Sequence, residues 1–135
     1  MGRKAFVSGP IQGMETEQDY RDAIREICVR CGFEVLDPWK REKVIYNGAE
    51  RGWWNKVPAA DFIQRDLEDI EKCDLLVAYL PKLSAGTCME LFYARLKRKK
   101  TICVCLMPSI SPWIAYHSNM ILKSIEELEQ ALREI

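Results

Sequence analysis

The chain has 135 residues, 48% of them apolar, and its 20 basic and 20 acidic side chains cancel to zero net charge. This length suits one hydrophobic core, so we predict a single domain over residues 1–135. Zero net charge argues against a nucleic-acid polymer as partner, because no basic field would hold its backbone. No apolar run approaches the ~20 residues that span a bilayer and no signal peptide is recognisable, so we expect a cytoplasmic protein without a membrane partner.

Short β-branched or aromatic runs alternate with helical patterns along the chain, which is typical of a parallel α/β sheet. The predicted strands are 5–8, 33–36, 75–80, 101–106 and 119–122. The predicted helices are 16–31, 60–72, 88–99 and 124–134, and a short helix can also form at 112–117. These elements predict an α/β three-layer sandwich with a parallel sheet of about five strands. Ligands of such sheets bind beyond the carboxyl ends of the strands.

The first predicted strand is followed by the loop S-G-P-I-Q-G, residues 8–13. Its glycines could bring backbone N–H groups against a phosphate or a sugar. The loop is neither a G-x-G-x-x-G nor a Walker sequence, however. A tight turn from strand to helix explains it about as well.

Cysteine is the next residue type with possible chemistry, and the chain has six. Cys28 and Cys31 form a C-x-x-C, but the pair falls late in a helical pattern and no second pair accompanies it. Cys103 and Cys105 alternate with apolar residues, as small buried strand residues do. In a cytoplasmic protein all six are expected to stay reduced, so packing is favoured over a disulfide framework or a metal site.

After the second predicted strand comes a polar loop of about twenty residues, 37–58, which is long for a compact domain. It carries the aromatic residues Trp39, Tyr46, Trp53 and Trp54. Such loops are usually binding elements or disordered, and so many aromatics argue against disorder. Stacking on a flat ligand and packing at a subunit interface both remain open.

Asp66 lies on the apolar face of its predicted helix. At 100° per residue it falls within the arc of Phe62, Ile63, Leu67, Ile70 and Cys73. An acid in that position is costly unless it is paired, hydrogen-bonded or protonated. Asp66 is therefore a candidate proton donor, and a structural anchor to a backbone N–H or an arginine is the alternative.

Glu90 has two interpretations. Thr87 and Glu90 have the spacing of a capping box, in which both side chains would satisfy backbone N–H groups at a helix start. Alternatively, Glu90 lies in the first turn of the helix, where the dipole favours an ionised carboxylate, and faces a pocket. We predict that Thr87 caps and that Glu90 faces the pocket. With Asp66, it would supply the two carboxyl groups that cleavage of a glycosidic bond requires.

Four segments, in this order, resemble the nucleoside 2-deoxyribosyltransferase superfamily, which includes the nucleoside 5'-monophosphate N-glycoside hydrolases. They are F-V-S-G-P-I at 6–11, R-D-L at 65–67 with C-D-L-L-V-A at 73–78, S-A-G-T-C-M-E-L at 84–91 and S-P-W-I at 111–114. The resemblance implies a doubly wound, Rossmann- or flavodoxin-like sheet and no metal or organic cofactor. It also implies a homodimer or larger homo-oligomer in which a neighbouring subunit completes each site.

The resemblance also implies roles for individual residues. The glutamate matching Glu90 attacks C1' of the sugar to form a covalent glycosyl-enzyme, and the aspartate matching Asp66 assists the departing base. Water resolves the intermediate in the hydrolases and a second base does so in the transferases. The substrate-binding residues implied are Phe6, Ser8, Gly9, Pro10, Ile11, Trp53, Ser84, Gly86 and, from the neighbouring subunit, Ser111.

Two serines favour a 5'-monophosphate substrate. Ser84 stands where the transferases tend to have an aspartate, and Ser111 stands where they have an asparagine, with Ser118 as the alternative register. A hydroxyl donates to phosphate without adding negative charge.

Two departures from the family pattern bear on which sugar and which phosphate group the site would accept. Phe6 replaces a tyrosine, which could leave room for a 2'-hydroxyl. Gln12 replaces an arginine that would face the phosphate. The sequence thus predicts a hydrolase of a nucleoside 5'-monophosphate, ribo- or deoxyribo-, acting through glycosyl-Glu90. A nucleoside 2-deoxyribosyltransferase and a catalytically inactive nucleotide-binding module are the alternatives.

Overall fold

The computed structural model describes residues 2–40 and 62–135, and within them five parallel strands form one sheet in the order β2-β1-β3-β4-β5. The strands are β1 (Arg3–Ser8), β2 (Phe33–Leu36), β3 (Leu75–Leu80), β4 (Lys100–Cys105) and β5 (Met120–Leu122). The bounds of β2 and β3 are those predicted, and the other strands differ only at their ends. The α/β class with a parallel sheet is confirmed.

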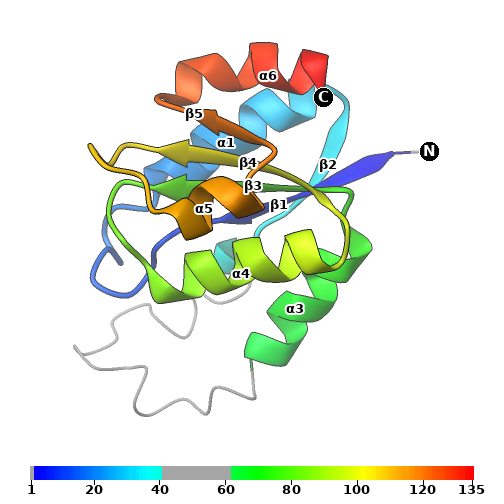
Figure 1. Ribbon diagram of the computed structural model, residues 1–135. Coiled ribbons are helices and arrows are strands. Elements are labelled where there is room, and N and C mark those ends of the chain that lie inside the picture. The colour runs from blue at the N-terminus through cyan, green and yellow to red at the C-terminus, as the bar shows by residue number, and fades with distance from the viewer. Residues whose placement is uncertain (1, 41–61) are drawn as a thin grey trace.

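Helices cover both faces of the sheet (Figure 1). One layer holds α1 (Asp19–Arg30) and α6 (Leu128–Glu134), and the other holds α3 (Ile63–Lys72), α4 (Ala85–Leu96) and α5 (Pro112–His117). The connection from β1 to β2 therefore uses one face and the connection from β2 to β3 the other. The winding reverses between β1 and β3, and ligands of doubly wound sheets bind beside such a reversal, at the carboxyl ends of the strands.

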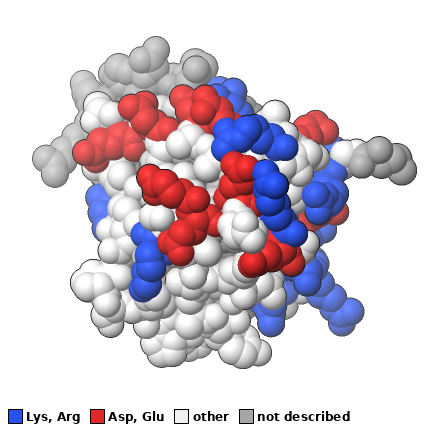
Figure 2. Space-filling model, turned by 90° about the horizontal axis from the view of Figure 1, so that it is seen from above, with Lys and Arg blue, Asp and Glu red and all other residues white. Residues whose placement is uncertain are grey.

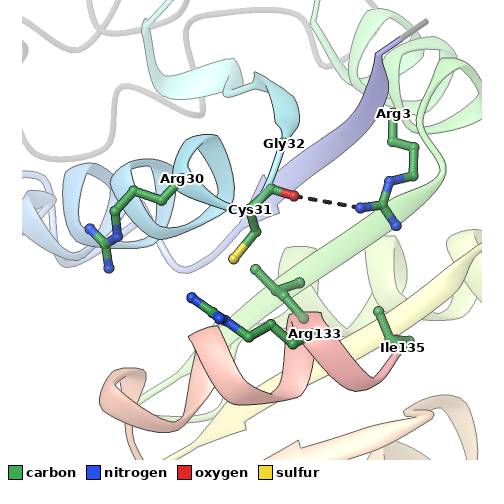
Figure 3. A pocket seen from close by; sticks show the side chains of 7 residues that line it. Arg3, Arg30, Cys31, Gly32, Arg133 and Ile135 are labelled. Carbon is green, nitrogen blue, oxygen red and sulfur yellow. Dashed lines mark hydrogen bonds between the residues drawn. The ribbon is translucent and has the colours of Figure 1, made fainter.

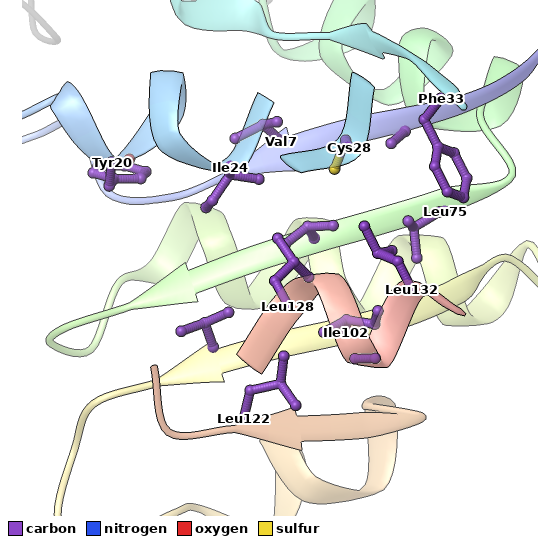
Figure 4. Packing of buried hydrophobic residues seen from close by; sticks show 14 residues of the cluster. Val7, Tyr20, Ile24, Cys28, Phe33, Leu75, Ile102, Leu122, Leu128 and Leu132 are labelled. Atoms are coloured by element: carbon purple, nitrogen blue, oxygen red, sulfur yellow. The ribbon is translucent and has the colours of Figure 1, made fainter. Parts of the chain in front are cut away.

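Strand side chains alternate between two cores because successive residues point to opposite faces of a sheet. Ala5 and Val7 face α1 and α6, whereas Phe6 faces α3 and α4. Figure 4 labels these members of the first core: Val7, Tyr20, Ile24, Cys28, Phe33, Leu75, Ile102, Leu122, Leu128 and Leu132. By the same alternation Ser8, the last residue of β1, points to the side of α4.

The start of α4 differs from the prediction. The helix begins at Ala85 rather than Cys88, because the N-cap is Ser84 and not Thr87. The Ser84 Oγ accepts a hydrogen bond of 3.3 Å from the Thr87 N–H, and the two hydroxyl groups share another of 3.0 Å. The prediction that Thr87 caps this helix is wrong.

A complete capping box does occur, before the last helix. Ser124 and Glu127 form it, and the Glu127 Oε2 accepts from the Ser124 N–H at 2.8 Å. The turn that follows Ser124 is a 3-10 helix over Ile125–Glu127, and α6 begins at Leu128. The predicted single helix 124–134 is therefore two elements.

The predicted loop 37–58 begins as a helix, since residues 38–40 are helical. The Asp37 Oδ1 accepts a hydrogen bond of 3.0 Å from the Trp39 N–H, as an N-cap side chain does, and a proline in the next position suits a first helical turn. Tyr46, Trp53 and Trp54 lie outside the described residues. The predicted substrate contact of Trp53 therefore also lies outside them.

The face over α1 and α6 carries intermixed positive and negative side chains, with no large area of one sign (Figure 2). Over residues 2–40 and 62–135, every helix is too short or too polar to cross a bilayer.

Candidate active site

Glu90 lies at the reversal point of the sheet. The Ser8 Oγ donates a hydrogen bond of 2.5 Å to the Glu90 Oε1, which ties α4 to the end of β1. The Glu90 carboxylate is thus directed toward the sheet rather than back to its own helix start. Because α4 begins at Ala85, Glu90 is in the second turn and not, as predicted, in the first.

The electrostatic surroundings of Glu90 oppose its ionisation. Burial raises the pKa of the Glu90 carboxyl from the ordinary 4.5 to about 7. The hydrogen bond from Ser8 and the charge of Arg21 lower this pKa, and the charges of Asp66 and Asp37 raise it. The predicted benefit from the helix dipole is therefore outweighed. Glu90 instead changes its protonation state near neutral pH, where carboxyl groups at active sites are often tuned to titrate.

Asp66 is buried on α3, with 6% of its surface exposed, as its place on the apolar arc predicted. The helix α3 contacts both α4 and β1. The Asp66 charge contributes to the raised pKa of Glu90, so the two carboxyl groups influence each other. The structure brings together the two acids that the sequence singled out.

The loop after β1 is held by the first turn of α1. The Gln18 Nε2 and the Tyr20 hydroxyl both donate to the Pro10 carbonyl oxygen, at 2.9 and 3.0 Å. A Cβ added to Gly9 would lie 2.6 Å from the Tyr20 Cε2 and 2.7 Å from its Cζ. Gly9 therefore has a packing reason, the close approach of a tyrosine ring, whether or not the loop binds a ligand.

A buried ion pair beside this loop was not found from the sequence. The Arg21 Nη1 and the Asp37 Oδ1 are 2.8 Å apart, and each side chain is only 2% exposed. Arg21 shares the buried arc of α1 with Ile24 and Cys28. The reasoning that singled out Asp66 on its apolar face would also have found Arg21.

The serines expected to bind substrate have protein partners here. Ser84 caps α4, Ser111 caps α5 by accepting 3.2 Å from the Trp113 N–H, and Ser118 donates 2.7 Å to the Ile114 carbonyl oxygen. Their substrate contacts stay predictions.

The remaining candidate substrate residues differ in their exposure. Gly86 lies in the first turn of α4 and is exposed, and Ile11 is half-buried. Phe6 is fully buried between the sheet and its helices. A contact between Phe6 and a substrate also stays a prediction.

An apolar groove of about 380 Å³ runs between α4 and α5. Met89, Phe92, Ser111 and Trp113 are among its lining residues. Met89 and Trp113 are 69% and 75% exposed, which is unusual for side chains of this size and polarity. A contiguous apolar patch of this kind is typical of an interaction surface.

A second hollow, of about 590 Å³, lies at the end of the sheet where the strands begin (Figure 3). Arg3, Cys31 and Arg133 surround it, and Arg3 is the first residue of β1. Arg30 and Arg133 both bind Glu129, at 2.8 and 2.6 Å. Its arginines thus already have partners, and it lies at the amino ends of the strands, away from Glu90.

The model of the nucleoside 2-deoxyribosyltransferase family matches residues 5–119, a span that includes Ser8, Asp66 and Glu90. The chain belongs to this family. Family membership makes it an enzyme of the nucleoside deoxyribosyltransferase and N-glycosidase class, which confirms the resemblance drawn from the four motifs. No curated protein matches the sequence.

Solved structures share the fold of this family member. The 2-deoxyribosyltransferase of Bacillus psychrosaccharolyticus aligns over 96% of this chain and 95% of its own, with a TM-score of 0.71 and 16% identity. The CMP N-glycosidase BcmB of Clostridium botulinum aligns over 98% of both chains, with a TM-score of 0.64 and 20% identity. At these identities the likeness is one of fold.

Proposed function

We propose that this enzyme hydrolyses the N-glycosidic bond of a nucleoside 5'-monophosphate, with Glu90 as the nucleophile. The observation that carries this proposal is the 2.5 Å hydrogen bond from Ser8 to Glu90 at the reversal point of the sheet. Ser84 and Ser111, where transferases of the family carry acidic or amide side chains, support a phosphate-bearing substrate. A CMP N-glycosidase and a 2-deoxyribosyltransferase both share this fold, so the preference for hydrolysis rests on the two serines.

The chemistry needs one carboxylate oxygen of Glu90 free for attack. Ser8 occupies Oε1, which leaves Oε2 to form the bond to C1' as the C1'–N bond breaks and its electron pair leaves with the base. In the state that reacts, Glu90 is ionised and Asp66 holds the one proton of the coupled pair, and that proton would neutralise the departing base. Water then attacks C1', the ester bond to Glu90 breaks, and the Asp66 carboxylate takes the proton from that water.

The test is release of free base from a panel of ribo- and deoxyribonucleotides and their nucleosides, separated by chromatography. We expect release from at least one 5'-monophosphate and slower release from the matching nucleoside. If no free base is released from any substrate at high enzyme concentration, the proposal is wrong. Faster base exchange than hydrolysis, when a second free base is supplied, would favour a deoxyribosyltransferase.

Asp66→Asn distinguishes a proton donor from an anchor. If Asp66 protonates the base, the variant should lose about 10²–10⁴-fold in turnover of the natural nucleotide. The loss should be much smaller with 7-methylguanosine 5'-monophosphate, because its cationic base leaves without a proton. Equal losses on both substrates, measured by single-turnover kinetics, would instead make Asp66 an anchor.

We further propose that the groove between α4 and α5 is the interface of a homodimer. Its exposed apolar side chains need a partner, and Ser111, which the family resemblance assigns to the site of a neighbouring subunit, lines the same groove. A symmetric interface would place one Ser111 near each partner.

Met89→Asp should convert this dimer to a monomer and lower turnover, because a charge in an apolar interface is costly to desolvate. Light scattering coupled to size-exclusion chromatography measures the mass. Val29→Asp is the matched control, since Val29 is an apolar residue 56% exposed on α1, outside the groove. A wild-type monomer, or a Met89→Asp dimer, would contradict the interface.

A further inference from the structure

Arg21 joins the backbone on both sides of Ser8. Its Nη2 donates 2.9 Å to the Gly9 carbonyl oxygen and its Nη1 donates 3.3 Å to the Val7 carbonyl oxygen. These are the residues directly after and before Ser8. The planar guanidinium can bridge two acceptors in a fixed geometry, which a lysine cannot do in the same way.

The rest of the guanidinium is held as firmly. The Arg21 Nε donates 2.6 Å to the Gln18 Oε1, and Nη1 also binds Asp37 at 2.8 Å. Gln18 in turn binds the Pro10 carbonyl oxygen, so both arms of the network end on the loop that follows β1. Arg21 therefore connects α1, Asp37 and this loop at the point where the loop presents the Ser8 hydroxyl.

Stability alone does not account for the ion pair between Arg21 and Asp37. A buried ion pair adds little to stability, and replacing one by packed apolar residues is often neutral or favourable. The Asp37 Oδ2 is buried and has no hydrogen-bond partner in the described part of the chain, which adds a further cost. An arrangement of this cost at the edge of an active site is more readily explained by positioning.

Within residues 2–40 and 62–135, the charged and hydrogen-bonding groups that act on Glu90 come from β1, α1, α3 and the residue after β2. Ser8 on β1 and Arg21 on α1 favour its charged form, whereas Asp66 on α3 and Asp37 after β2 disfavour it. Tyr20 on α1 is a further titratable group nearby, and burial, assisted in part by Glu90, raises its pKa, so it stays neutral. In the part of the chain that the structure describes, Arg21 is thus the positive charge that opposes the two aspartates.

We propose that Arg21 is a positioning residue, which fixes the Ser8 hydroxyl against Glu90 and, balanced by Asp37, sets the charge of that carboxyl. The inference rests on the proposed function, in which Glu90 must be ionised to attack. Arg21 does not need to touch the substrate, because it acts through the backbone around Ser8 and through its charge.

The test compares the acidic limb of the pH profile of kcat/KM in matched variants. Arg21→Met should move this limb upward by about half a pH unit or more, and Asp37→Asn should move it downward. Arg21→Lys keeps the charge but not the bridge, so it should leave the limb near its place and lower kcat by about tenfold. KM should change little in each.

A purely structural role would lower the melting temperature without moving the limb, and that result overturns the proposal. Should Arg21→Met fail to fold, Asp37→Asn and Ser8→Ala decide. Ser8→Ala should move the limb upward, because the hydroxyl donates to the charged form. An unchanged limb in both folded variants refutes the inference.

Failure of the proposed function is distinguishable. A wild-type protein that releases no base contradicts the hydrolase, yet the Glu90 carboxyl can still be titrated by ¹³C NMR of side-chain-labelled protein. Opposite shifts of its midpoint in Arg21→Met and Asp37→Asn would sustain the role of the pair. Identical midpoints in all variants would refute it.

Discussion

Replacing Glu90 by glutamine is expected to reduce base release by a factor of about 10³ or more, since a neutral amide cannot form the covalent bond to C1'. The amide keeps nearly the same shape and can still accept the hydrogen bond from Ser8. Binding of a nucleotide should therefore survive, as titration calorimetry would show. If Glu90→Gln keeps wild-type turnover, Glu90 is not the nucleophile. If the wild type has no turnover and binds equally well, the inactive binding module is supported.

The same substitution should stabilise the fold above pH 7. Folding raises the pKa of Glu90 from 4.5 to about 7, so the folded state pays a penalty for the charged carboxylate. The penalty is absent below pH 4.5, where both states hold the proton, grows as pH rises, and is complete above pH 7. It amounts to at most about 3 kcal/mol, less screening by water at the partly exposed side chain.

Urea unfolding at pH 5 and pH 8.5 measures this effect. Glu90→Gln should gain free energy of unfolding at pH 8.5 and differ little at pH 5. Glu26→Gln, on the exposed side of α1, is the control and should show no such dependence on pH. Equal effects of Glu90→Gln at the two pH values would mean that burial of the charge is not their cause.

Gly9→Ala is expected to destabilise the protein by about 3 kcal/mol, as overpacking of a tight site does. The new methyl group would overlap the Tyr20 side chain, most closely its hydroxyl oxygen and then Cε2 at 2.6 Å and Cζ at 2.7 Å. This ring cannot easily move, because it stacks on Tyr79 with centroids 4.4 Å apart and its hydroxyl donates to Pro10. Denaturant unfolding measures the loss, and turnover should fall with it because Gly9 follows Ser8.

Double variants identify the clash. Tyr20→Phe removes the hydroxyl, which is the atom nearest the added methyl group and holds the ring to Pro10, but leaves Cε2 and Cζ in place, so adding Gly9→Ala to it should still cost part of the full amount. Tyr20→Leu removes these ring atoms, and adding Gly9→Ala to it should cost little. An equal cost in both backgrounds would show that the ring is not the obstacle.

Much of the secondary structure was predictable from local periodicity. The runs over β2 and β3 alternate between two cores, and the bounds of both strands were predicted without error. Asp66 was correctly placed on a buried helix face by the same reasoning. These features depend on a repeat of 2 or 3.6 residues within one element, which is why the sequence by itself determined them.

The helix start before Glu90 was not predictable in this way. Ser84 and Thr87 are both good caps, and the two alternatives differ too little in local energy for sequence to decide. In the folded protein the Glu90 carboxylate is engaged by Ser8, so it does not serve a capping box with Thr87. The partner of Glu90 is a residue 82 positions away, which local sequence does not reveal.

The sequence alone thus determined the fold class and the family, and it singled out Asp66 and Glu90 as candidate catalytic acids, because local periodicity and short ordered motifs carry that information. Only the tertiary structure decided that Ser8 meets Glu90 and that Arg21 and Asp37 form a buried pair behind them. Those contacts join β1, α4, α1 and the end of β2, which become neighbours only through the strand order β2-β1-β3-β4-β5. The burial that raises the pKa of Glu90 has the same origin, since it depends on what packs around the side chain and not on its position along a helix.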